Sequence, residues 1–349
     1  MLFSKLFQRS RKGSLPRRRR SLRPQLEALE DRSLPSTFTV VNLADNTSPG
    51  ALRWAIGQAN THAGPDLINF APGLNGTIVL TGSQIDITDD LTIDGPGAAK
   101  LTVSGNSASR VFHLSGSATD VEIDGLTISN GRASGTTVTG ALGDATLGGG
   151  IFNDQAHLTL SQVTVTHNQT AGFIGAGGGI ASISGATLTV ENCTFSGNLA
   201  SGTSVDGPGG GIFSDAGSTL TVSQTTFTGN QAIDGGAIAI WGGAVAAVSD
   251  STFSDNLARG NDGGPGQGAT PADNGGAIFA TDESVVAASA GSTLTVAHST
   301  FTGNHALGGN GGLGSPGSDG GSGGQAQGGA VSVAGVTTLA NLSYCTFAN

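Results

Sequence analysis

The stretch TFTGNQAIDGGAI, residues 226–238, places a lone Phe227 three residues before Asn230 and a pair of glycines just before Ile238. Both halves of this arrangement return along the chain. Phe-x-x-Asn recurs at Phe195–Asn198, Phe227–Asn230, Phe253–Asn256 and Phe301–Asn304, with a Val165–Asn168 variant and Phe347 near the end. Gly-Gly-x-(Ile/Val) ends at Ile151, Ile180, Ile212, Ile238, Ile278 and Val331. Such repetition indicates a fold built from stacked copies of one unit.

The spacing of the two motifs divides each unit into a fixed half and a free half. From each Ile or Val to the next core Phe or Val the distances are 14, 15, 15, 15, 23 and 16 residues, whereas from each Asn to the next Ile or Val they are 12, 14, 8, 22 and 27. The fixed half contains an apolar-polar-apolar triplet, which is typical of a short strand that buries one face. These triplets are Leu158–Leu160, Leu188–Val190, Leu220–Val222 and Leu294–Val296. We therefore predict three short strands in each unit, one at the Gly-Gly-x-Ile motif, one at the Leu-Thr-Val triplet and one at the Thr-Phe pair.

Short strands at this regular spacing, without helical crossovers, predict an all-β solenoid in which each strand pairs with its copy in the next coil, ~4.8 Å away. We expect the Phe to stack inward on its copies, and the Asn to occupy a left-handed turn and bond to its copy. The glycine pair permits a sharp corner where a Cβ would clash. The residues assigned to these structural tasks are Phe195, Asn198, Phe227, Asn230, Phe253, Asn256, Phe301, Asn304, Gly235, Gly236, Ile238, Gly275, Gly276 and Ile278.

The rest of the chain divides by composition. We predict a basic disordered leader over 1–36, an N-terminal cap over 37–75 with a helix near 49–60, irregular first coils over 76–147, and regular coils over 148–349 that stop inside a repeat. In the helix, Ser48 suits the cap, Pro49 suits the first turn, and Leu52, Ile56 and Ala59 share a face. This short amphipathic helix would cover the open end of the solenoid.

Composition narrows the function classes. Glycine supplies 59 of 349 residues, only 11% of residues are charged, and 37% are hydrophobic, which together favour a turn-rich β protein. The leader holds ten of the fifteen Lys and Arg and three of the 25 acids, so it carries +7 and the remainder carries 5 − 22 = −17. An acidic body repels nucleic acid and anionic lipid. No apolar run approaches the ~18 residues of a transmembrane helix.

Three segments resemble known families. The alternating Gly-Gly-Ala-Ile and Phe-x-x-Asn motifs of residues 148–349 resemble the repeat of polymorphic outer-membrane proteins, which implies a right-handed parallel β-helix at a bacterial surface, often an adhesin passenger. Residues 48–60 are similar to the S-L-R-E-A-I-x-x-A-N segment that starts many bacterial extracellular β-helix proteins, although Ala51 and Trp54 depart from it. Residues 26–32, LEALEDR, resemble the L-E-x-L-E-D-R leader of large bacterial surface and secreted proteins, which implies export.

Residue chemistry predicts no catalytic group and no cofactor. Cys193 and Cys345 occupy the same place in coils that are four apart, about 19 Å by strand spacing, so we expect two buried free thiols rather than a disulfide. The six histidines lack zinc-site spacing. A lyase would need clustered cations, yet the body's cations do not recur at one coil position; they are Arg53, Lys100, Arg110, Arg132 and Arg259. Three acids, or acids plus an Arg, converging on one groove would favour catalysis.

We therefore expect a non-catalytic exported or cell-surface protein, at the outer membrane or outside a bacterium, with a structural, adhesive or glycan- or protein-binding role. The alternative is a polysaccharide lyase or glycoside hydrolase on the same pectin-lyase-like scaffold. A partner would bind where two long connections, Leu257–Asn274 and His305–Gln327, leave the same corner of successive coils. Calcium is an alternative ligand near Asp206, Asp262 and Asp319. The sequence indicates no oligomeric state.

Overall fold

The computed structural model describes residues 35–140, 143–203, 206–265, 267–269, 275–285, 290–313 and 321–348. Residues from Leu34 onward form one compact unit. All but the last two residues of the expected 1–36 leader lie outside the described ranges.

The Leu-Thr-Val triplets build a ten-stranded sheet, here called sheet A. Its strands, in spatial order, are β1 Thr37–Val40, β2 Asp66–Phe70, β5 Leu91–Asp94, β8 Asp120–Asp124, β14 His157–Ser161, β19 Thr187–Glu191, β23 Thr219–Ser223, β27 Val245–Ser249, β31 Thr293–Ala297 and β35 Leu339–Ser343. Leu188 pairs with Leu220 and Val190 with Val222, so each apolar residue lies beside its copy in the core.

The Thr-Phe segments build a nine-stranded sheet, sheet B. Its strands are β3 Gly76–Val79, β6 Leu101–Ser104, β9 Thr127–Ser129, β15 Thr164–Thr166, β20 Thr194–Ser196, β24 Thr226–Thr228, β28 Thr252–Ser254, β32 Thr300–Thr302 and β36 Thr346–Ala348. The rings of Phe195, Phe227, Phe253, Phe301 and Phe347 stack inside this sheet with centroids 4.8–4.9 Å apart and planes 2–16° from parallel. The stacked aromatic core expected from the sequence is present.

The Gly-Gly-x-Ile segments build an eight-stranded sheet, sheet C. Its strands are β4 Ile85–Ile87, β7 Phe112–Ser115, β13 Ile151–Asp154, β18 Ile180–Ile183, β22 Ile212–Ser214, β26 Ile238–Ile240, β30 Ile278–Ala280 and β34 Val331–Val333. From β13 onward a glycine pair precedes each strand, because the backbone of the next coil approaches too closely there for a Cβ. Gly235 has a φ of +61°, and a Cβ on Gly236 would lie 2.3 Å from the carbonyl oxygen of Gly276 in the next coil.

The expectation of three strands per coil is wrong for the regular coils, which carry a fourth. Sheet D consists of β10 Arg132–Ser134, β16 Gln169–Gly172, β21 Leu199–Gly202, β25 Gln231–Ala232, β29 Leu257–Arg259 and β33 His305–Leu307. From β16 onward each of these strands follows the repeated Asn, and each strand of the sheet buries little more than one small residue, such as Ala200, Ala232 or Ala258. A single alanine gives no periodic signal in the sequence.

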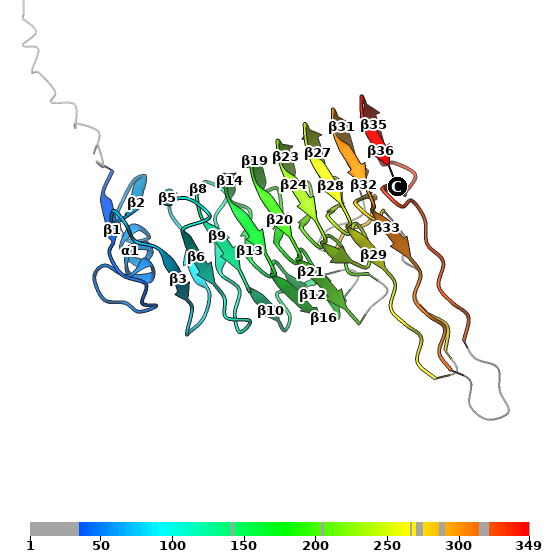
Figure 1. The fold of residues 1–349 in the computed structure, drawn as a ribbon, viewed down its shortest axis with the longest axis horizontal. Coiled ribbons are helices and arrows are strands. Elements are labelled where there is room, and N and C mark those ends of the chain that lie inside the picture. Colours follow the sequence, from blue (N-terminus) through cyan, green and yellow to red (C-terminus); the bar gives the residue numbers. More distant parts are fainter. Residues whose placement is uncertain are drawn as a thin grey trace, which may run out of the picture. The chain divides into compact units, whose positions relative to one another are not determined.

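A three-stranded sheet, sheet E, lies beside the coils and was also not expected. It contains β11 Val138–Gly140, β12 Gly143–Leu147 and β17 Ile174–Ala176, and β11 pairs with β12 in antiparallel fashion. All other strand pairs in the described residues are parallel and join successive coils (Figure 1). The molecule is therefore a parallel β-helix, as the spacing predicts.

The capping helix is present but shorter than expected. Helix α1 spans Leu52–Ala59 rather than 49–60, and Ala51, not Ser48, is its N-cap, without a side-chain capping bond. The physical reason lies at Gly50, whose φ of +90° and whose carbonyl, bonded to the N–H groups of Val41 and Asn42, hold the chain outside the helix. The expected face is buried, and α1 lies at the N-terminal end of the coils (Figure 1).

The repeated asparagines form a continuous ladder, but their backbone is not left-handed as expected. Positive φ belongs instead to the preceding residue, for example His167, Gly229 and Asp255. The Asn230 side chain donates to the carbonyl oxygen of Phe195 at 3.0 Å and to Oδ1 of Asn256 at 3.0 Å, and its own Oδ1 accepts from Asn198. Because the left-handed residue comes one position before the asparagine, the asparagine side chain points into the coil, where it bonds to its copies.

Candidate functional site

An aromatic row on the outer side of sheet C leads to the main candidate site. Outward positions on adjacent strands alternate between Phe and Ala along this row: Phe152, Ala181, Phe213, Ala239 and Phe279. Sheet E and neighbouring loops cover the row and form a second hydrophobic cluster, separate from the core inside the coils. Trp241 lies between Phe213 and Phe279 and makes edge-to-face contacts with both rings, at centroid distances of 5.7 and 6.3 Å.

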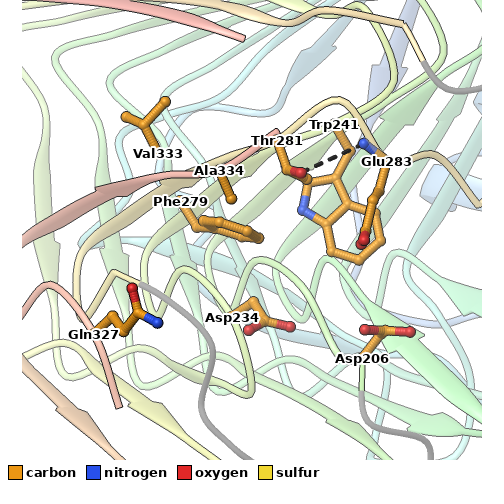
Figure 2. Close-up of a pocket in the computed structure, with 9 residues that line it drawn as sticks. All are labelled: Asp206, Asp234, Trp241, Phe279, Thr281, Glu283, Gln327, Val333 and Ala334. Atoms are coloured by element: carbon orange, nitrogen blue, oxygen red, sulfur yellow. Dashed lines mark hydrogen bonds between the residues drawn. The ribbon is translucent and has the colours of Figure 1, made fainter. Parts of the chain in front are cut away.

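A pocket of about 260 Å³ lies at the Phe279 end of this row. Trp241, Phe279, Thr281 and Asp234 are buried and form its floor. Its more exposed rim contains Asp206, Glu283, Gln327, Val333 and Ala334. Figure 2 places the side chains of Gln327, Asp234 and Asp206 along one side of the pocket and the Phe279 and Trp241 rings along the other.

The floor contains an unused hydrogen-bond donor. The indole nitrogen of Trp241 is buried and has no acceptor among the residues that the structure describes. A buried N–H without a partner is uncommon, because removing it from water without a new bond is unfavourable by roughly 1–3 kcal/mol. In Figure 2 the edge of the indole that carries the nitrogen faces the Phe279 side of the pocket. A ligand oxygen bound there would satisfy this donor.

The pocket borders the corner where the sequence predicts recognition. Gln327 ends one long connection, and the described parts of the two connections lie side by side, with Gly260 N–H bonded to Leu307 O at 3.0 Å and Gly263 N–H to Asn310 O at 2.8 Å. These segments extend together beyond the coils (Figure 1, yellow and orange). Asp273 and Asp319 lie outside the described residues.

The sequence suggested calcium as an alternative ligand. Within the described ranges, no group of three or more His, Cys, Asp or Glu side chains is placed to hold a metal ion. Asp262 instead accepts a hydrogen bond from the Asn310 N–H at 2.8 Å and pairs with Arg259 at 3.0 Å. The hydrogen bond from Asn310, followed by the charge of Arg259, lowers the pKa of Asp262. This carboxylate joins the two long connections.

A second pocket brings together an acid and two arginines, which the sequence did not predict. Asp86, Arg110 and Arg132 line it. The guanidinium of Arg110 is largely occupied, because it donates to the carbonyl oxygens of Gly148 and Leu147 and to Gln84. Burial lowers the pKa of Arg110 to about 10, so it stays charged at neutral pH.

The geometry of the other cations weakens the lyase alternative. Arg53 pairs with Asp45 at 2.6 Å and donates to the carbonyl oxygens of Ser83 and Gln84, so it fastens the N-terminal cap. Arg259 pairs with Asp262. With Arg110 bonded to carbonyls, three of the body's five cations have structural partners. A lyase base and enolate-stabilising cations need donors that are available to substrate.

The two cysteines are free, as expected, but only Cys193 is buried; Cys345, in the last described coil, is half-buried. Cys193 begins a column of side chains that continues through Thr225, Ser251 and Ser299. Successive members are joined by backbone N–H bonds to the next hydroxyl, at 3.2–3.3 Å. The Cys193 thiol also donates to the carbonyl oxygen of Glu191 at 3.2 Å.

This difference predicts unequal thiol reactivity. Burial raises the pKa of Cys193 to about 11, so the reactive thiolate is scarce at pH 8. We expect a chromogenic disulfide reagent at pH 8 to titrate one thiol, Cys345, in the native protein and a second only after unfolding. Cys345→Ser should remove the fast phase, and a fast phase that survives in this variant would contradict the assignment.

The pocket residues were missed by sequence reasoning for a specific reason. Asp234 and Glu283 lie in connections of variable length, Trp241 directly follows strand β26, and none of the three belongs to a repeated motif; of the pocket residues, Asp206 alone was predicted as a ligand, for calcium. The alternation of Phe213, Ala239 and Phe279 could have indicated a covered outer face, but it becomes visible only when the Gly-Gly-x-Ile strands are aligned in register.

Comparisons with known proteins agree with this architecture. A family model described as a right-handed β-helix region matches residues 74–320, more than half of the chain. Comparison with curated proteins gives no match. Within the described ranges, no helix is long and apolar enough to span a membrane.

Proposed function

Because the chain belongs to the right-handed β-helix family, we propose that it is a non-catalytic, exported binding protein that serves at the surface of a bacterium and holds a glycan in the pocket beside Trp241. The observation that carries this proposal is the pocket itself, with a buried indole donor in an aromatic floor and a polar rim. The recurring Phe, Asn and Gly residues support it indirectly, because core packing, the asparagine ladder and the tight corners account for them without any catalytic role.

The chemistry of the pocket favours a glycan without negative charge. Carboxylates at Asp234 and Glu283 accept hydrogen bonds from hydroxyl or ammonium groups, the indole N–H donates to an oxygen, and the Gln327 amide does both. The acidic rim and the −17 charge of the body repel uronate chains. A volume of about 260 Å³ is near the lower end of ligand pockets, which fits one sugar unit of a longer chain.

Substitution at the rim tests the binding role. We expect a panel of immobilised neutral, amino-bearing and uronate polysaccharides to reveal binding to a neutral or amino-bearing member. Glu283→Gln should weaken that binding ~10-fold or more, because a hydrogen bond to a charged group contributes about 1.5–3 kcal/mol. Glu191→Gln, an exposed acid on sheet A, is the matched control and should bind as the wild type does. Equal affinities for both variants would move the binding site away from this pocket.

A glycoside hydrolase is the second candidate, and one observation favours it: Asp206, Asp234 and Glu283 line one pocket. Glycosidases use two carboxyl groups that flank the scissile bond. Release of reducing ends from the same panel distinguishes the candidates. New reducing ends produced by the wild type and lost in Asp234→Asn would replace the binding role with a catalytic one.

The export part of the proposal rests on the leader's composition and on its resemblance to bacterial export leaders. We expect the full chain to fractionate outside the cytoplasm of a bacterial host with the matching export machinery, and a form lacking residues 1–36 to remain inside. If the shortened form also reaches the surface, those residues are not the export signal.

A further inference from the structure

The pocket beside Trp241 carries charge of one sign only. Its lining includes three carboxylates, from Asp206, Asp234 and Glu283, and no Lys, Arg or His. Asp234 is 2% exposed, Asp206 is half-buried and Glu283 is exposed, so the negative charge extends from the floor to the rim. Each carboxylate has about four lone-pair positions, so it can accept from a ligand as well as from the protein. A ligand with a positive group would supply the charge that the lining lacks.

A second polar group sets a further requirement for the ligand. The Trp241 side chain is fully buried, and its indole nitrogen has no acceptor among the described residues. In Figure 2 this nitrogen is on the edge of the ring that faces Phe279, and Asp234 and Asp206 lie along the opposite side of the pocket. The two sides therefore ask for different groups, an oxygen that accepts from the indole and a cation that meets the carboxylates.

We infer that the pocket takes a sugar unit with a free amino group, charged as an ammonium, and this inference rests on the glycan-binding role proposed above. The ammonium has three donors, which can reach Asp234 and Asp206. A hydroxyl or ring oxygen of the same sugar accepts from Trp241, and the C–H face of the sugar packs on the Phe279 ring. An ammonium is also attracted to the face of an aromatic ring.

Other ligands meet only part of these requirements. A neutral sugar satisfies the indole but brings no positive charge to the carboxylates. An N-acetylated sugar has also lost that charge, and its acetyl group takes up space in a pocket of about 260 Å³. A lysine side chain brings an ammonium but has no oxygen close to it. The body as a whole, with 22 acids and 5 bases, attracts cationic chains to its surface.

The test compares three sugars that differ in one substituent. The full chain is titrated calorimetrically at pH 6 with the β-1,4-linked tetramers of glucosamine, N-acetylglucosamine and glucose. We expect the glucosamine tetramer to bind ~10-fold or more tightly than the other two, because hydrogen bonds to charged groups are stronger than neutral ones.

The preference should also depend on pH in one direction. The sugar ammonium resembles an α-amino group, whose pKa is about 8, so it is charged at pH 6 and mostly neutral at pH 9. The charged form is the one that the carboxylates favour. Affinity for the glucosamine tetramer should therefore fall ~10-fold as the pH rises from 6 to 9, while the affinities for the two uncharged tetramers stay constant.

Variants assign the two requirements to their side chains. Glu283→Gln removes a charge at an exposed position and should weaken binding of the glucosamine tetramer alone. Trp241→Phe keeps a ring, removes the indole N–H and should weaken all three tetramers. Glu191→Gln, an exposed acid on sheet A, is the matched control and should change none of them. Thermal melts of the variants check that the fold is intact.

The outcomes separate this inference from the broader glycan-binding role. Equal affinity for the glucosamine and glucose tetramers, with both weakened in Trp241→Phe, would overturn the amino-sugar assignment and leave the glycan-binding role in place. No binding of any tetramer would also overturn it, and the broader role fails only if the polysaccharide panel shows no binding either. Tighter binding of tetralysine than of the glucosamine tetramer, lost in Glu283→Gln, would replace the sugar with a basic peptide.

Discussion

Phe227→Asp is expected to abolish the cooperative thermal transition of the coils around it. Phe227 is fully buried and lies between Phe195 and Phe253, at centroid distances of 4.9 and 4.8 Å. Removing the ring alone destabilises a core by about 3–5 kcal/mol. The new carboxylate also has no partner in this aromatic stack, and burying it adds several kcal/mol more or forces it to stay protonated.

Thr228→Asp is the control, since its side chain lies on the outer side of the same strand. Surface substitutions usually change stability by less than about 0.5 kcal/mol, so we expect a melting curve close to that of the wild type. Far-UV circular dichroism and thermal melts of both variants provide the measurement. Similar losses in the two variants would show that the inward assignment of Phe227 is wrong.

Asn230→Asp is expected to destabilise the ladder at neutral pH although the two side chains have nearly the same shape. The Asn230 amide donates to Phe195 O and to Asn256 Oδ1, each at 3.0 Å, in a fully buried position. A carboxylate cannot donate, so both acceptors would face a negative charge. Losing one partner of a buried hydrogen bond destabilises by about 1–3 kcal/mol, and more where a charge is left unpaired, so we expect a loss of about 3–5 kcal/mol.

The loss should depend on pH in a definite direction. Burial and the facing oxygens disfavour the charged form, so the folded-state pKa of the new carboxyl lies above its unfolded value of about 4. The neutral acid, which can donate one bond, is therefore favoured by folding, and stability falls as the pH rises through the folded-state pKa. Relative to the wild type, chemical denaturation at pH 4 and pH 7 should show the smaller penalty at pH 4.

Asn341→Asp is the matched control, because Asn341 is exposed on the outer side of sheet A. This variant should unfold as the wild type does at both pH values. A penalty for Asn230→Asp that grows as the pH falls, or one equal to that of Asn341→Asp, would contradict the role assigned to the buried ladder.

The sequence predicts the inside of this molecule better than its outside. Phe227 and the triplet Leu220–Val222 recur at nearly constant spacing because every coil must pass the same core, and this constancy carries the prediction of stacked strands. The left-handed residue before each asparagine was missed because His167, Gly229 and Asp255 share no chemical type. Sheet D was missed because each of its strands buries little more than one small side chain, such as Ala232.

The candidate pocket depends on relations that a linear pattern does not contain. Asp206, Asp234 and Glu283 come from connections between different strands, and their meeting depends on how each connection folds back over the outer side of sheet C. Trp241 appears in the sequence as an ordinary apolar residue after a strand. Only its place between Phe213 and Phe279, beneath those connections, makes its indole nitrogen part of a site.

The asparagine ladder gives the solenoid a direction. Each Nδ2 group donates toward the following coil, from Asn168 to Asn198, then to Asn230, Asn256 and Asn304, so the amide dipoles are aligned along the stack and can polarise one another. A coil can complete its hydrogen bonds only when its successor has docked, and it exchanges contacts with immediate neighbours alone. We therefore expect folding to proceed coil by coil along the stack. A substitution at one asparagine should destabilise the adjacent coils before distant ones.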